Sequence, residues 1–180
     1  MRHPDDEYED EDDGHALDDV DSDDHQALVW NLLLLINPGD EEAALRQFDG
    51  YREAVAGGGA EARDLPETLA GIIDWTAGFR IPDEDVATLI DCLEQLAARW
   101  GIGIDWGGDA DDEDFIAGLD AAGVLAIAHD RLREHGYSLW LWQTGDGVQA
   151  GWMALRRDDQ AMRELAALLE FELRPGGDAL

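Results

Sequence analysis

The sequence predicts an α+β protein, in which N-terminal helices pack on a small, mostly antiparallel three-stranded sheet that a C-terminal helix follows. Four segments with helical spacing of apolar residues precede position 101, and strand-like alternation occurs near 102–106, 137–144 and 148–156. Helices gathered ahead of strands, rather than alternating with them, are typical of this class. A chain of 180 residues, 45% of them hydrophobic, is long enough for one domain with a buried core.

An acidic segment occupies the N-terminus. Between Asp5 and Asp24 there are 13 acids and no base. Because like charges repel and little apolar surface offsets the loss of chain entropy, we expect residues 1–22 to form a disordered tail. A single globular domain is expected over residues 23–175, beginning with a helix that Asp23 or Asp24 caps.

The first three helices are predicted from stop and capping signals. The run HQALVWNLLLLI ends at Asn37-Pro38-Gly39, and Asp40 is placed to cap a second helix. Asp64 and Glu67 have the spacing of a capping box for a third helix, around residues 67–76. The residues expected on the buried face of the second helix are Leu45, Phe48 and Val55.

The fourth helix has the clearest apolar periodicity, and a short strand is predicted after it. The helix is expected to begin at Pro82-Asp83 and to end at Gly101, before the strand at 102–106. Its predicted buried stripe consists of Val86, Leu89, Ile90, Leu93, Ala97 and Trp100.

A β-hairpin is predicted in YSLWLWQTGDGVQAGWMAL. Two strand-like runs flank Gly145-Asp146-Gly147, which is typical of a tight turn. Large apolar residues fall on both faces of these strands, so we expect helices to cover much of the sheet on both sides. A last helix, capped by Asp158, is expected to bury Met162, Leu165, Ala166, Leu169 and Leu173.

The charge restricts the partners that this protein can bind. The formal net charge is -31, and all 12 bases are arginine. Binding to nucleic acid or to an anionic membrane needs clustered basic residues, so neither is expected, whereas a basic protein is favoured. The arginine-only bias resembles that of GC-rich bacterial genes. The N-terminus lacks the apolar core of a signal peptide, and no apolar run approaches the roughly 20 residues of a membrane span, so we expect a cytoplasmic protein.

An acid-rich stretch after the predicted strand is the main candidate site. From Asp109, the spacing of an EF-hand fails, because Asp114 stands where the turn glycine belongs and Asp120 where the last glutamate belongs. We therefore expect no metal and no cofactor, and interpret the stretch as a solvated loop that a basic partner could contact. The candidate partner-binding carboxylates are Asp105, Asp109, Asp111, Asp112, Glu113 and Asp114.

Seven tryptophans are the second unusual feature of the sequence. Trp30, Trp75, Trp100 and Trp106 fit a core, whereas Trp140, Trp142 and Trp152 gather in the hairpin. Two interpretations of the hairpin group stay open. One is core packing, with Trp142 and Trp152 as cross-strand neighbours; the other is a partly exposed platform that binds arginines through cation–π contacts.

Catalytic chemistry finds little support in the sequence. There is no HExxH, no G-x-S-x-G and no phosphate-binding glycine loop. We interpret His129 as structural, because no nucleophile lies near it in sequence, and Cys92 as a small core or boundary residue. No catalytic residue is assigned, and the protein is not expected to be an enzyme.

Three motifs resemble a known family. They are IDW at Ile104 to Trp106, the following DEDFIAGLDAAG, and LWLWQTGDGVQAGWMAL. From Leu69 to Leu173 the chain resembles a family of bacterial proteins known only as a domain of unknown function. The resemblance implies a strand that ends in an acidic, Trp-containing stretch, then a helix, a hairpin and a helix, and it implies no catalytic residues.

The sequence therefore favours a non-enzymatic acidic binding protein whose partner is basic. One specific form is an immunity protein that neutralises a cationic toxin, since steering and blocking by charge suit such pairs. Two alternatives stay open: a metal-dependent enzyme that uses the carboxylates at 105–114, and a housekeeping scaffold with a solubilising tail.

Overall fold

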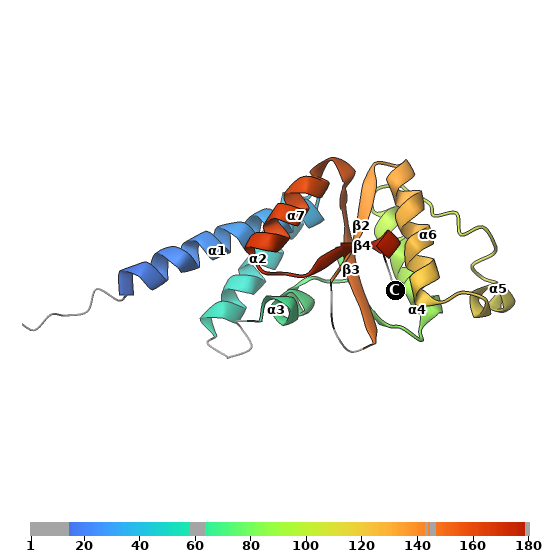
Figure 1. Cartoon of the computed structure of the whole chain (residues 1–180), viewed down its shortest axis with the longest axis horizontal. Coiled ribbons are helices and arrows are strands. Elements are labelled where there is room, and N and C mark those ends of the chain that lie inside the picture. Colours follow the sequence, from blue (N-terminus) through green and yellow to red (C-terminus); the bar gives the residue numbers. More distant parts are fainter. Residues whose placement is uncertain (1–14, 58–63, 143, 145–146, 179–180) are drawn as a thin grey trace, which may run out of the picture.

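The predicted α+β class is confirmed by a computed structural model, which describes residues 15–57, 64–142, 144 and 147–178, without the side chains of 15–22. Two layers of helices enclose one antiparallel sheet (Figure 1). None of the helices described is both long and apolar enough to cross a bilayer. The elements are α1 (His15–Ile36), α2 (Glu41–Ala56), α3 (Leu65–Ile72), β1 (Gly78–Pro82), α4 (Val86–Ala98), α5 (Glu113–Ala117), α6 (Ala121–Glu134), β2 (Tyr137–Trp142), β3 (Val148–Leu155), η2 (Arg156–Asp158), α7 (Asp159–Leu168), β4 (Leu173–Pro175) and η3 (Gly176–Asp178).

The sheet is built around the predicted hairpin, which is confirmed as β2 and β3. The strand order is β1-β3-β2-β4, and every neighbouring pair is antiparallel. Trp140 lies opposite Trp152, and Leu141 lies opposite Gly151. A Cβ at Gly151 would overlap the carbonyl oxygen of Trp140 and would lie 3.0 Å from the side chains of Leu141 and Phe79, so this point of β3 requires a glycine.

Each face of the sheet has its own hydrophobic core, as the apolar alternation predicted. Trp140 and Trp152 pack with residues of α1, α2, α3 and α7, whereas Leu139, Leu141 and Met153 pack with α4 and α6. Figure 1 shows the first group of helices on one side of the sheet and α4, α5 and α6 on the other. The sheet is therefore a central layer without an open face.

The predicted strand at 102–106 is wrong. Ile102 and Trp106 are buried and Gly103 and Asp105 are exposed, so the alternation predicted the inward face correctly. However, the segment has no strand beside it, because β1 and β4 occupy the two edges of the sheet. Within the described residues the sheet has four strands, two of which were not predicted: the short GFRIP of β1 and LRP of β4.

Several helix boundaries differ from the predicted ones. α1 begins at His15 rather than at Asp23 or Asp24, so part of the segment predicted as tail is helical, while residues 1–14 lie outside the described residues. α3 ends at Ile72 because the chain turns there into β1. Pro82 closes β1, and α4 starts at Val86 with Asp85 as its cap. Leu173 belongs to β4 and not to the last helix.

Two predicted core residues lie at the surface. Leu45 is 51% exposed, because α2 turns Ala43, Ala44 and Tyr51 inward instead. Trp75, in the turn between α3 and β1, is 68% exposed. The caps were more predictable: the side chains of Asp40 and Asp64 both accept hydrogen bonds from the first turns of their helices, as expected.

A polar cluster around Arg99 connects the two layers. Its guanidinium donates to Asn37 Oδ1 at 3.2 Å, to the Thr76 carbonyl at 3.0 Å and to Asp40 Oδ2 at 2.6 Å. Asn37 is itself buried and donates to Gln47 Oε1 at 2.7 Å. The hydrogen bond from the Ala43 amide, and then the contact with Arg99, lower the pKa of Asp40. One arginine therefore joins the α1–α2 turn, the connection to β1 and the end of α4.

The buried stripe of α4 generates a stability prediction. Leu93 is 0% exposed, so Leu93→Ala should lower the free energy of unfolding by about 2–5 kcal/mol through lost burial and a residual cavity. Urea denaturation measures this. Leu45→Ala, on the exposed face of α2, is the control and should change stability by no more than about 0.5 kcal/mol. Equal effects of the two substitutions would contradict the packing described here.

Candidate partner-binding site

The acidic loop, residues 105–114, begins where the chain leaves α4. Gly101 adopts a left-handed backbone (φ 71°), which a residue with a Cβ rarely does, and turns the chain away from the helix. Ile102 and Trp106 are then buried against the core of α4 and α6. The Trp106 indole nitrogen donates to Glu94 Oε1 at 2.8 Å. The start of the loop is therefore fixed by burial and by a hydrogen bond.

Carboxylates within the loop stabilise its turns. Asp105 accepts a hydrogen bond from the Gly107 amide at 2.9 Å, and Asp109 accepts one from the Asp111 amide at 3.0 Å. Asp112 caps α5 by accepting from the Asp114 amide at 2.9 Å. Side chains that bond to the amide two residues ahead form local turns without any other partner. These three aspartates thus shape the loop that carries them.

The far end of the loop is held by an aromatic contact. Phe115 and Ile116 of α5 are half-buried against the same core as Trp106. Gly108 lies directly on the Phe115 ring, and a Cβ at this position would overlap that ring. Arg131 of α6 also donates to the Asp105 carbonyl at 3.1 Å. The loop is therefore attached to the core at both ends.

Sequence reasoning did not identify Glu94 and Arg131, which help to hold the loop. Arg131 carries no local signal in the sequence. A partner for Trp106 could have been expected, since a buried indole N–H usually finds an acceptor, but the choice of Glu94 depends on how α4 packs.

The six candidate carboxylates are all exposed. None of them forms an ion pair with a base among the residues described. Arg131, whose Nε contacts the loop backbone, directs its Nη1 to Glu134 at 3.0 Å. The negative charge of the loop is therefore not neutralised within the described part of the chain. These residues are Asp105, Asp109, Asp111, Asp112, Glu113 and Asp114.

One family comparison gives a result for this chain. A family model described as a domain of unknown function (DUF6630) matches residues 28–176. The chain belongs to this family. The match reaches back to residue 28, so the resemblance predicted from Leu69 onward extends through α2 and α3 and into the C-terminal part of α1. No curated protein and no solved structure matches the chain.

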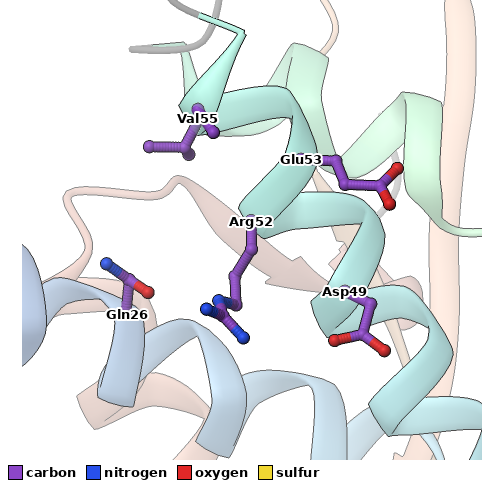
Figure 2. A pocket seen from close by; sticks show the side chains of 6 residues that line it. Gln26, Asp49, Arg52, Glu53 and Val55 are labelled. Atoms are coloured by element: carbon purple, nitrogen blue, oxygen red, sulfur yellow. The ribbon is translucent and has the colours of Figure 1, made fainter.

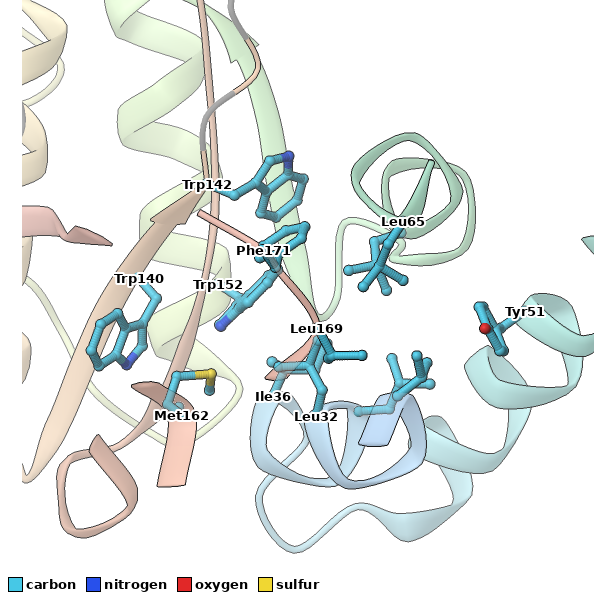
Figure 3. Packing of buried hydrophobic residues seen from close by; sticks show 14 of the residues in the cluster. Leu32, Ile36, Tyr51, Leu65, Trp140, Trp142, Trp152, Met162, Leu169 and Phe171 are labelled. Atoms are coloured by element: carbon cyan, nitrogen blue, oxygen red, sulfur yellow. The ribbon is translucent and has the colours of Figure 1, made fainter. Parts of the chain in front are cut away.

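The hairpin tryptophans lie in the core of the DUF6630 domain, so the interpretation as an exposed platform is wrong. Trp140, Trp142 and Trp152 are 1%, 4% and 0% exposed. Their rings pack under α1, α3 and α7, together with Leu65, Met162 and Phe171 (Figure 3). Trp142 and Trp152 share one face and their ring centroids lie 4.9 Å apart, but the contact is diagonal, because Trp140 lies opposite Trp152 and Trp142 lies opposite Ala150.

His129 and Cys92 occupy structural positions in the DUF6630 domain, as predicted. His129 is buried, and its Nδ1 lies 3.2 Å from the carbonyl oxygen and 3.3 Å from the amide nitrogen of Leu139. Burial lowers the pKa of His129. Burial raises the pKa of the half-buried Cys92 thiol, and the negative charges of Asp91 and Asp85 raise it further. A raised pKa suppresses the nucleophilic thiolate.

The acidic loop also generates a prediction about metals. Within the residues described, no group of three or more His, Cys, Asp or Glu side chains is arranged to hold a metal ion. Three of the loop carboxylates already accept hydrogen bonds from backbone amides. Calorimetric titration with Ca²⁺, Mg²⁺ and Mn²⁺ should therefore show nothing tighter than about millimolar, weaker than dedicated calcium sensors. The alternative of a metal-dependent enzyme would be favoured by a one-to-one isotherm with micromolar affinity that is lost in the double variant Asp109→Asn, Asp111→Asn.

Proposed function

We propose that this protein is a non-enzymatic acidic binding protein that acts in the bacterial cytoplasm on a basic protein, such as a cationic toxin that it neutralises. The observation that carries the proposal is the acidic loop. It displays six exposed carboxylates, unpaired with bases in the described structure, on a backbone attached to the core at both ends.

Attachment of the loop matters for affinity. Groups that are ordered before binding lose less conformational entropy when a complex forms. Trp106 and Phe115 hold the ends of the loop, and the aspartate turns restrict its middle. Arginines of a partner could therefore pair with carboxylates whose positions are already set, which favours slow dissociation.

The overall charge acts at longer range. A net charge of -31 raises the rate at which a basic protein arrives, and salt screens this attraction beyond about 8 Å at physiological ionic strength. Residues 1–14 carry eight acids and one base, so they contribute to this attraction wherever they lie. The two acidic regions should consequently affect different rate constants.

The kinetic prediction separates these contributions. Asp111→Asn, Asp112→Asn and Asp114→Asn together should speed dissociation, because direct charge pairs are lost while asparagine at 112 still caps α5. Deleting residues 1–14 should lower the association rate at low salt and leave dissociation almost unchanged. Surface plasmon resonance at two salt concentrations, against the basic protein captured from the source cell, measures both rates.

The control removes the same charge from the other layer. Glu41→Gln, Asp49→Asn and Glu53→Gln alter three exposed acids of α2 that form no ion pair among the described residues. This variant should change association but not dissociation. If the loop variant and the α2 variant dissociate alike, the acidic loop is only a solvated connection and the proposal is overturned.

A further inference from the structure

A small cavity lies beside the sheet, on the side away from the acidic loop. Its volume is about 190 Å³, and the first turn of α3, strand β1 and the end of β2 surround it. Asp64 and Glu67 line it from α3, Arg80 from β1, and Trp142 and Thr144 from the end of the hairpin strand. It is separate from the open hollow between α1 and α2, which exposed side chains such as Asp49 and Arg52 border (Figure 2).

Trp142 has a buried ring, and its indole N–H has no acceptor among the described residues. The side chain is only 4% exposed, and its ring packs on Trp152 and Phe171. Figure 3 shows the indole nitrogen of Trp142 on the side of the ring turned away from both. No residue of the described structure accepts a hydrogen bond from it. Unlike the enclosed indole nitrogens of Trp140 and Trp152, it remains accessible, and Trp142 lines the cavity.

The rest of the lining offers both signs of charge. Asp64 uses Oδ1 for the Glu67 amide, at 3.5 Å, which leaves its second oxygen available. Glu67 and Arg80 are exposed and form no ion pair among the described residues. The cavity therefore presents two carboxylates as acceptors, and an indole N–H and a guanidinium as donors. A ligand that satisfies both sets carries a cation or neutral donors for the carboxylates, and a hydrogen-bond acceptor for the indole and the guanidinium.

The volume limits the size of this ligand. Pockets for drug-sized molecules and cofactors usually measure about 300–1,000 Å³. A cavity of about 190 Å³ is too small for these, and it fits one side chain with an adjoining peptide group. Two carboxylates against one guanidinium, in a protein of net charge -31, favour a cationic side chain over an anionic one.

We infer that this cavity binds an arginine or lysine side chain of a peptide segment, as a second site separate from the acidic loop. The cation lies between the carboxylates of Asp64 and Glu67, and Trp142 Nε1–H donates to the carbonyl oxygen of the adjoining peptide group. The inference takes from the proposed function only that the partner is basic.

The test uses the full chain and a small probe, N-acetyl-arginine N-methylamide, followed by ¹H–¹⁵N NMR of the tryptophan indoles. The Trp142 peak should shift and saturate. The peak that disappears in Trp142→Phe is the Trp142 peak. If that variant does not fold, nuclear Overhauser effects between the Trp142 and Phe171 rings assign the peak instead. Glu67→Gln should weaken binding about two- to fivefold, as expected for one exposed charge contact.

The controls separate charge from shape. Glu41→Gln alters a matching exposed first-turn glutamate in α2 and should leave probe affinity unchanged. The uncharged norleucine analogue should bind more weakly than the arginine probe. A third probe, the corresponding glutamate analogue, tests the opposite charge. The inference is overturned if the arginine and norleucine probes bind equally or if the glutamate analogue binds more tightly than the arginine probe. It is also overturned if the Trp142 peak does not move at tens of millimolar arginine probe. None of these outcomes depends on the acidic loop, so the proposed function stands or fails separately.

Discussion

The architecture depends on a single constraint: the central hairpin is apolar on both faces. Trp140 and Trp152 project to one side and Leu141 and Met153 to the other, and all four are essentially inaccessible to water. Each buried aromatic removes about 150–250 Å² from water, so leaving either face open would be costly. Two helical layers are therefore required. The helices α1, α2 and α3 of one layer and α4, α5 and α6 of the other precede the hairpin in the chain. After the hairpin, α7 packs in the layer of α1, α2 and α3 (Figure 1).

Layers that meet only through a sheet can shift relative to one another, and the Arg99 cluster restricts such movement. Arg99 follows α4 in the second layer, while Asn37 and Asp40 belong to the first. Hydrogen bonds to charged groups contribute more than neutral ones, and a buried donor left unsatisfied costs about 1–3 kcal/mol. The contact therefore favours one alignment of the layers, and with it one position for the start of the acidic loop.

The two candidate binding regions lie in different layers and differ physically. The acidic loop is an exposed surface whose carboxylates are set by local turns. The cavity at Trp142 combines the exposed side chains of Asp64, Glu67 and Arg80 with a buried indole ring. The loop is suited to several arginines at a broad interface, and the cavity to a single side chain. The two proposals therefore place separate contacts for a basic partner in different layers of the molecule.

The sequence by itself determined the α+β class, the hairpin, the helix caps at Asp40 and Asp64 and the exposure of the acidic stretch, because these follow from local spacing, turn residues and charge. Tertiary structure decided which segments paired. Residues 102–106 alternate correctly but have no neighbouring edge, whereas the Gly- and Pro-containing β1 is a strand only because β3 lies beside it. It also decided that the Trp142 ring is buried while its N–H has no acceptor among the described residues, since alternation specifies a shared face and only the packed helices specify what covers it.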